Sequence, residues 1–249
     1  MKMTAEIVFS GLMFALLPTL ASAQTTAPNP SAEDIVAKMM QFDSQRQSQI
    51  TGYTATRHYV AVNEKRHAEM LVRVECGRDG AKRFTIVSEE GSSEIRKHVF
   101  QKLLSEESEA SSRGTRNGTR VTPTNYDFRI AGQEALETGP AYVLEVAPKT
   151  PNKYLIKGKI WVDANDYSIV RIEGEPARNP SFWVHNVHFL HTYQKVGQFW
   201  FASSTDTTSR VRIFGDAELT IENTDYRLNP RDNSNTTSIE VDSEARLVR

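Results

Sequence analysis

The sequence predicts a mainly β protein in which one long antiparallel sheet curves and two helices cover its concave side. The first observation is a clean alternation of apolar and polar residues over Arg210–Ile221, which is typical of a strand with one buried and one solvated face. The second is the recurrence of strand-like runs, about ten in all, interrupted by two stretches with helical spacing. A sheet of that size must curl or close, because an open edge invites aggregation. The apolar faces of the helices then find their partner on its concave side.

Residues 1–23 have the pattern of an export signal. Lys2 precedes a short apolar run, Ile7–Leu20, and Ala21-Ser-Ala23 forms a small-residue cleavage site. The run is too short, and wrongly flanked, for a membrane-spanning helix, although an uncleaved anchor is the alternative. We therefore expect cleavage after Ala23 and an exported chain whose mature part has no transmembrane segment.

Charge and cysteine content narrow the function classes further. The formal net charge of −1 gives no general attraction to nucleic acid, so no nucleic-acid partner is expected. Cys76 is the single cysteine and cannot form an internal disulfide bond. It ends the strand-like run Met70–Cys76, which favours a buried thiol over a reactive one. Stability must then come from core burial.

The chain begins its folded part with a helix. Residues 24–30 form a Thr/Pro-rich leader that we expect to be disordered. Ser31 suits the N-cap of a helix over Ala32–Arg46, and Asp34 completes a capping box. An apolar stripe follows at helical spacing: Ile35, Val36, Met39 and Met40. The methionine pair is either core against the sheet or an adaptable surface that touches a ligand.

Period-two alternation and β-branched or aromatic content predict the strands. An Asp-Gly turn at Asp79-Gly80 joins the second strand to the third as a hairpin. The predicted strands are Thr51–Asn63, His67–Gly77, Lys82–Ser88, Asn125–Ile130, Ala141–Ala147, Lys153–Asp163, Ser168–Glu173, Ser181–Val196, Phe199–Ser203 and Arg210–Arg227.

A second amphipathic helix is inserted between the third and fourth strands. Over Glu94–Glu107 the apolar residues recur at three- and four-residue spacing: Ile95, Val99, Leu103 and Leu104. Its acidic C-terminal end opposes the helix dipole. The following segment, Ser111–Thr122, carries Arg113, Arg116 and Arg120 among Gly, Ser and Asn. It is either a mobile solvated loop or a basic docking patch.

No catalytic or metal constellation emerges from the motifs. His185, His188 and His191 would align on a helix, but their surroundings indicate a strand, where His185 and His191 point one way and His188 the other. Three ligands cannot then converge on one zinc ion without a bulge. The chain also lacks a G-x-S-x-G elbow and a Gly-rich phosphate loop. We predict no catalytic residues, no metal site and no cofactor.

Apolar surface is the remaining functional signal. Trp and Phe residues crowd the second half of the chain, and the strand near residue 187 is apolar on both faces. Ideal alternation puts Val184 on one face and Val187 with Phe189 on the other. Ordinary core would explain this pattern, and an apolar ligand cavity is the functional alternative.

Two hairpin motifs resemble a known family. Lys157–Asp163 (KGKIWVD) followed by Tyr167–Glu173 (YSIVRIE) resembles a hairpin of LolA-like outer-membrane lipoprotein-sorting proteins. Asn179–Trp183, and Tyr193–Gly197 with Phe199-Trp200, resemble a periplasmic branch of that group. The resemblance covers about Ala32–Arg227. It implies an unclosed antiparallel half-barrel, with helices as a lid over an apolar concavity, and a periplasmic location.

These observations predict a single half-barrel domain over residues 31–228 and a polar, loosely ordered tail over residues 229–249. The leading hypothesis is a non-catalytic periplasmic carrier or sensor that binds lipid, or the acyl chains of a lipoprotein. Its partners would be lipid or an acylated protein, with membrane receptor proteins as a further class. The expected ligand-binding residues are Ile95, Val99, Leu103, Leu144, Ile156, Ile160, Phe201 and Ile213. The alternatives are an envelope protein-interaction or stress-sensing module with a self-filled core and, third, an unrecognised hydrolase.

Overall fold

The computed structural model describes residues 29–179, 184–212 and 215–230. The expected signal peptide, most of the leader and the tail after Pro230 lie outside these ranges. The helical elements are α1 (Ala32–Gln49), α2 (Ser93–Ile95), the π-helical η1 (Arg96–Phe100), α3 (Gln101–Ser111) and the short 3₁₀ turn η2 (Arg116–Gly118). The strands are β1 (Ile50–Asn63), β2 (His67–Cys76), β3 (Lys82–Gly91), β4 (Tyr126–Leu136), β5 (Gly139–Pro148), β6 (Ile156–Asp163), β7 (Ile169–Pro176), β8 (Val184–Val196), β9 (Phe199–Val211) and β10 (Gly215–Pro230).

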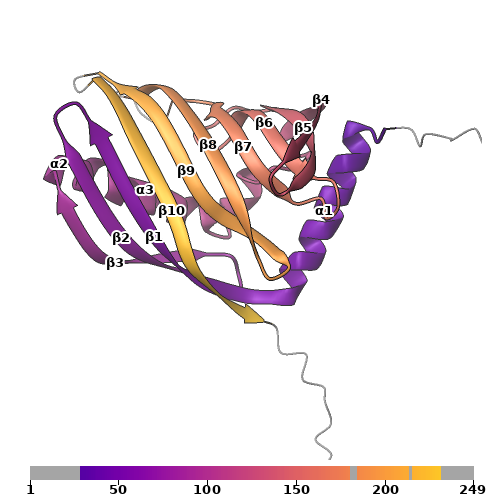
Figure 1. The fold of residues 1–249 in the computed structure, drawn as a ribbon, viewed down its shortest axis with the longest axis horizontal. Helices are drawn as coiled ribbons and strands as arrows, with labels where there is room; N and C mark the ends of the chain where they lie inside the picture. The colour runs from indigo at the N-terminus through magenta and orange to yellow at the C-terminus, as the bar shows by residue number, and fades with distance from the viewer. Residues whose placement is uncertain (1–28, 180–183, 213–214, 231–249) are drawn as a thin grey trace, which may run out of the picture.

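All of these strands belong to one antiparallel sheet of 10 strands, in the order β3-β2-β1-β10-β9-β8-β7-β6-β5-β4. Strands β3 and β4 stand at opposite ends of this order and do not pair with each other, so the sheet is unclosed. Figure 1 shows the sheet curving strongly from β3 round to β4. The predicted fold class, a mainly β curved half-barrel with two helices, is therefore confirmed.

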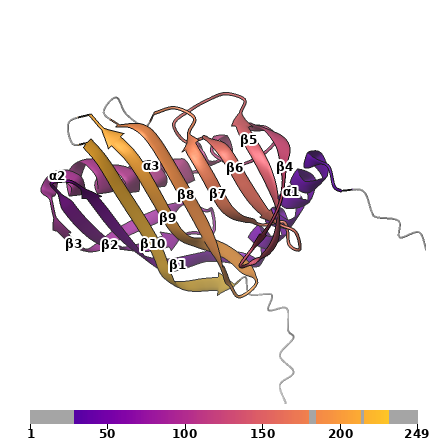
Figure 2. The same ribbon diagram turned by 45° about the horizontal axis from the view of Figure 1, so that its top comes forward.

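One row of side chains crosses the sheet and identifies its inner face. Directly opposed residues on neighbouring strands point to the same side. The row contains Met70, Tyr59, Ile221, Thr205, His191, Ile172, Ile160 and Leu144. At one end of the row α1 packs on Leu144 and Ile160. At the other end η1 and α3 pack on Tyr59 and Met70. Both helices thus lie on the same concave face, as predicted, over different parts of the sheet (Figure 2).

Helix α1 begins and packs as its sequence predicts. The Ser31 hydroxyl accepts a hydrogen bond from the Asp34 amide at 3.1 Å, and the Asp34 carboxylate accepts from the Ser31 amide at 3.2 Å. Ile35, Val36 and Met39 are buried against β5 and β6, and Met40 packs on the same cluster. The methionine pair therefore belongs to the core at this end of the sheet.

Strand β9 is longer than the sequence predicted. The predicted strand ended at Ser203, because Ser204–Ser209 is polar and lacks apolar alternation. In the structure β9 continues to Val211, paired with β8 on one side and β10 on the other. Two neighbouring ladders satisfy the backbone amides and carbonyls of this segment, so it remains a strand without apolar side chains.

A β-bulge in β8 corrects the predicted histidine arrangement. The register shifts between His185 and His188, and Asn186 adopts a left-handed conformation with φ of 49°. His185 opposes Arg210 and His188 opposes Thr208, two residues on one face of β9, whereas His191 opposes Thr205 on the other face. The prediction that His185 and His191 share a face was wrong, because the extra residue reverses the alternation.

The Arg-rich segment is fastened to the rest of the fold. The Arg120 guanidinium pairs with the Asp43 carboxylate of α1. Arg116 donates to the Asp79 carbonyl in the β2–β3 turn, and Arg113 lies 3.8 Å from the Asp79 carboxylate. All three predicted basic residues thus have intramolecular partners. Across the described ranges, no helix combines the length and apolarity that crossing a membrane requires.

Candidate functional site

A cavity of about 900 Å³ lies between the inserted helix and the sheet. We call α2, η1 and α3 together, Ser93–Ser111, the lid helix (Figure 2). Its cavity side presents Ile95, Val99 and Leu103. The floor comes from β1, β8, β9 and β10. The apolar floor residues are Ala61, Val62, Val184, Val187, Phe189, Val211, Ala217, Leu219 and Ile221.

Short side chains on the floor leave space between the lid helix and the sheet. Thr205, Thr207 and Ser209 follow one another along the inner face of β9, and all three line the cavity. Ser209 opposes Ala217 on β10, so two small side chains leave the space above that part of the floor unfilled. Beneath α1 the equivalent positions hold larger residues, such as Leu144 and Ile160, which fill the space. The cavity is thus a consequence of residue volume on β9 and β10.

The π turn in the lid helix separates a core stripe from a cavity stripe. In a regular α-helix, Val99 would lie on the same face as Ile95, because it follows Ile95 by four residues. The π turn inserts one residue, so Phe100 occupies the core position instead, followed by Leu104. Val99 is left 36% exposed. Leu103 is half-buried, and it and Val99 both border the cavity. The register change thus aims two apolar side chains at the cavity.

The bulge in β8 has a matching effect on the floor. It turns Val184 to the same face as Val187 and Phe189, whereas ideal alternation predicted opposite faces. All three side chains are half-buried and border the cavity. Two local irregularities, one in the lid helix and one in the sheet, therefore both enlarge the apolar lining.

A partly buried ionic cluster stands at the inner end of the cavity, with the Lys82 and Glu107 side chains 27% and 30% exposed. The Glu107 carboxylate on α3 accepts hydrogen bonds from Arg57 Nη1 at 2.6 Å and from Lys82 Nζ at 2.7 Å. Arg57 also donates to Asn223 Oδ1 at 2.7 Å and to the Tyr59 hydroxyl at 3.1 Å. We call Arg57, Lys82, Glu107 and Asn223 the polar wall. These contacts account for an acidic residue near the C-terminal end of the inserted helix, because two cations from the sheet neutralise Glu107.

Electrostatics keeps the polar wall ionised. Burial opposes the charge on Glu107, but the nearby charges and hydrogen bonds of Lys82 and Arg57 outweigh it and lower its pKa to about 2. Burial also opposes the charge on Lys82, yet Glu107 raises the pKa of its ammonium group. Both groups are therefore charged at neutral pH.

His191 contacts the inner end of the cavity floor. Its Nδ1 is hydrogen-bonded to the hydroxyl of Thr205. Burial, reinforced by the charge of Lys82, lowers the pKa of His191 to about 4. The imidazole is therefore neutral at neutral pH, and it adds to the polar surface behind the cavity.

Ionisable side chains from the lid helix, nearby loops and β10 complete the lining: Arg66, Glu94, His98, Lys102, Glu106, Lys153 and Glu218. They are half-buried or exposed, in contrast to the apolar floor. Lys153 Nζ lies 3.4 Å from the Glu106 carboxylate, which links the β5–β6 loop to α3. The site therefore combines an apolar interior with a charged, solvated rim.

The predicted site residues fall in different places. Ile95, Val99 and Leu103 come together at the cavity. Leu144 and Ile160 are buried under α1, where Ile156 packs beside them. Phe201 is buried in an aromatic group with Tyr53 and Tyr226. Ile213 lies outside the described residues. Sequence reasoning missed Leu219 and Ile221 as site residues, although their alternation with Glu218 and Thr220 had placed them on the buried face.

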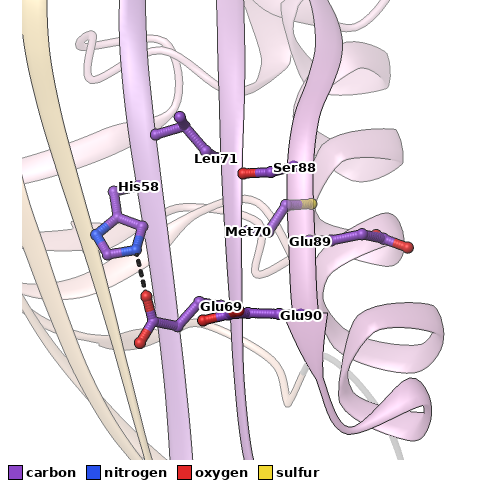
Figure 3. Close-up of a pocket in the computed structure, with 7 residues that line it drawn as sticks. All are labelled: His58, Glu69, Met70, Leu71, Ser88, Glu89 and Glu90. Atoms are coloured by element: carbon purple, nitrogen blue, oxygen red, sulfur yellow. Dashed lines mark hydrogen bonds and ion pairs between the residues drawn. The ribbon is translucent and has the colours of Figure 1, made fainter.

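A second, smaller hollow of about 350 Å³ lies at β1, β2 and β3 (Figure 3). The His58 ring lies 2.9 Å from one Glu69 oxygen, and the His67 ring lies 3.1 Å from the other. Figure 3 shows His58 and Glu69 facing each other across these strands. Within the described ranges, no group of three or more His, Cys, Asp or Glu side chains is placed to hold a metal ion.

Comparisons with known proteins find likeness in structure only. No family model and no curated protein sequence matches the chain. A putative outer membrane lipoprotein-sorting protein domain from Vibrio parahaemolyticus is similar over 84% of this chain and 96% of its own, at 14% identity and a TM-score of 0.47. A DUF1329 family protein from Desulfovibrio piger is similar over 80% and 94%, at 11% identity and a TM-score of 0.46.

A LolA superfamily protein from Nitrosomonas europaea is similar over 81% of this chain and 94% of its own, at 8% identity and a TM-score of 0.39. Two of these three structures carry the family names that the hairpin motifs led us to expect. The likeness concerns the general arrangement of strands and helices, and it identifies neither a ligand nor a partner.

Proposed function

We propose that this protein is a non-catalytic periplasmic carrier or sensor that holds an acyl chain of a lipid or lipoprotein beneath the lid helix. The cavity is the observation that carries the proposal. Its volume of about 900 Å³ is near the upper end of the roughly 300–1,000 Å³ range of small-molecule sites. Aliphatic and aromatic side chains from the lid helix and four strands converge on it.

The chemistry of the lining suits a hydrocarbon chain. Each methylene transferred from water to an apolar site contributes about 0.8 kcal/mol, so one long chain gives useful but reversible binding. A polar head group would stay at the rim, where Lys102 and Lys153 are exposed to solvent. Shielding of the chain from water requires no reaction, in agreement with the absence of a catalytic motif from the sequence.

The cavity favours this proposal over a self-filled interaction module. A module of that kind would have a dry, fully packed interior under both helices. The α1 end of the sheet is packed in this way, with Ile35, Leu144 and Ile160 each 0% exposed. The lid helix is packed only along its Phe100 stripe, and beside that stripe Leu219 and Ile221 remain half-buried next to open space.

The hydrogen bond between His191 and Thr205 raises the hydrolase alternative, because a hydroxyl stands beside an imidazole at the cavity. A general base works best when its pKa lies near the operating pH. Burial holds the pKa of His191 at about 4, which makes the imidazole a weak base at neutral pH. Carrier or sensor therefore remains the better-supported function.

Binding of an acyl probe tests the proposal. We expect Val99→Asp to weaken capture of a fluorescent long-chain fatty acid at least tenfold, because a carboxylate at the cavity must be desolvated beside the chain. Val99 is 36% exposed, so the substitution should change the free energy of unfolding by less than about 0.5 kcal/mol.

Val87→Asp is the matched control. Val87 is 57% exposed on β3 and does not line the cavity, so the same chemical change is made away from the site. Titration of all three proteins with the probe should give equal affinities for the wild type and Val87→Asp. Equal affinity in Val99→Asp as well would contradict the proposed site, and no binding by the wild type would contradict the proposed function.

A further inference from the structure

The apolar cavity ends abruptly at the polar wall. The lining stops at a stepped edge on the floor strands: Ala61 on β1 and Phe189 on β8 lie one row short of Ile221 on β10 and Thr205 on β9. The row of Ile221 and Thr205 also holds Tyr59 and His191, and the next inner-face row holds Arg57 opposite Asn223. On α3 the lining stops at Glu106, and Glu107 follows. Polar or hydroxyl-bearing groups thus close the inner end on β1, β8, β10 and α3.

We propose that the polar wall sets the maximum length of the acyl chain that the cavity accepts. This inference rests on the proposed function and adds a specificity determinant to it. The chain would enter with its methyl end toward the wall, because the ionisable rim suits a polar head group. Arg57, Glu107 and Asn223 would then meet the end of the chain.

The wall resists displacement because its groups are mutually satisfied. Arg57 has an 8% exposed side chain and donates to Glu107, Asn223 and Tyr59. Asn223 is also buried, and its backbone carbonyl accepts a hydrogen bond from Gln194 at 3.0 Å. A methylene pushed between these groups would break the contacts of the buried Arg57 guanidinium without giving it a new partner, which is unfavourable. Further methylenes would instead have to remain at the rim in water.

The interior under α1 is apolar, and an apolar surface of that kind would not oppose the advance of an acyl chain as the polar wall does. At that end the cluster consists of residues such as Leu144, Val146 and Val162. In the row that leads from the cavity to this core, His191 stands between Thr205 and Ile172. The Arg57–Glu107 pair lies at the inner end of the cavity, where β1 and α3 continue beyond its lining.

The test measures affinity against chain length. Saturated fatty acids from octanoate to stearate, in steps of two methylenes, are titrated into the full chain by calorimetry. Each methylene that enters the cavity should tighten binding about fourfold. The affinity of the wild type should rise with this slope up to a limiting chain length and stay constant for longer chains. We call that limiting length the break. Affinity that rises through the whole series would overturn the proposal.

Two variants should move the break in opposite directions. Ile221→Phe adds bulk in front of the wall without touching the ionic cluster, and should shift the break to shorter chains. The triple variant Arg57→Ala, Lys82→Met, Glu107→Ala removes the charges and opens space, and should shift it to longer chains. Arg129→Met with Glu145→Leu is the control, because it removes an exposed ion pair between β4 and β5.

The outcomes separate the two proposals. If the wild type binds no chain of any length, the proposed function fails and the length limit falls with it. If it binds but the break stays in place in Ile221→Phe, the cavity holds chains and the wall does not limit them. Should the triple variant fail to fold, Ile221→Phe alone decides, since its polar wall is intact.

Discussion

The two ends of the half-barrel use the same device, a helix on the concave face of the sheet, with opposite results. Under α1 the helix stripe and the sheet interlock, and Ile35 and Ile160 are both 0% exposed. Under the lid helix only one stripe, with Phe100 and Leu104, reaches the sheet, while Val99 and Leu103 border open space. The difference lies in the floor, where β9 presents Thr and Ser.

This contrast shows that an amphipathic helix on a sheet does not by itself specify a packed core. Packing depends on whether the two surfaces together fill the space between them. The lid helix is instead held by charges near its C-terminal end, through Glu107, and by contacts of its core stripe with β1 and β2. Such fastening leaves the volume beside it unfilled.

The largest expected effect is at the packed end. Ile160→Asp places a carboxylate in a fully buried apolar site, and should lower the free energy of unfolding by at least about 4 kcal/mol. Leu103→Asp should cost much less, about 1–2 kcal/mol, because the cavity admits water to the new carboxylate. Urea unfolding of both variants measures the comparison. Equal destabilisation would mean that Leu103 is ordinary core and that the two ends do not differ.

A smaller effect is expected where the lid helix is fastened by charge. Glu107→Ala leaves Arg57 and Lys82 without their shared carboxylate, and should lower the free energy of unfolding by about 2–3 kcal/mol. The side chain of Glu107 is 30% exposed, so water compensates part of the loss. Replacement of Glu145, an exposed partner of Arg129, should cost less than about 1 kcal/mol. Similar values for the two variants would show that the polar wall does not fasten the lid helix.

The same carboxylate predicts a pH dependence. The pKa of Glu107 is lowered from 4.5 to about 2 on folding, so its stabilising contribution is complete above pH 4.5. That contribution should disappear as the pH falls from 4.5 to about 2, where the folded protein takes up the proton. Denaturant midpoints measured across this window should fall more steeply for the wild type than for Glu107→Ala. Parallel curves would contradict the ionised state of Glu107.

Much of this architecture could be predicted from local pattern. The capping box at Ser31, the alternation around Leu219 and Ile221, and the apolar periods of both helices each follow from short-range rules. The order of the elements and the need to cover one face of a large sheet then limited the fold to a curved sheet with helices inside it.

The features that shape the site were not predictable in the same way. The π turn at Arg96–Phe100 and the bulge at Asn186 each add one residue, and an added residue moves every later side chain to another face. Periodicity assumes that no such insertion occurs. The meeting of Arg57, Lys82 and Glu107 depends on contacts far apart in sequence, and the cavity depends on volumes summed over several elements. Three of the predicted site residues therefore line the cavity, while Leu144, Ile156 and Ile160 belong to the packed end.

Filling the floor tests the central claim, that the space beneath the lid helix holds an acyl chain. Thr207→Leu combined with Ser209→Leu adds apolar volume to the inner face of β9 and makes this end resemble the packed end. Wild type and variant are each titrated with a fluorescent long-chain fatty acid, and thermal unfolding is followed alongside. The account predicts at least tenfold weaker binding with an unchanged or raised midpoint. Undiminished binding in a folded variant would contradict it, because the chain would then lie elsewhere.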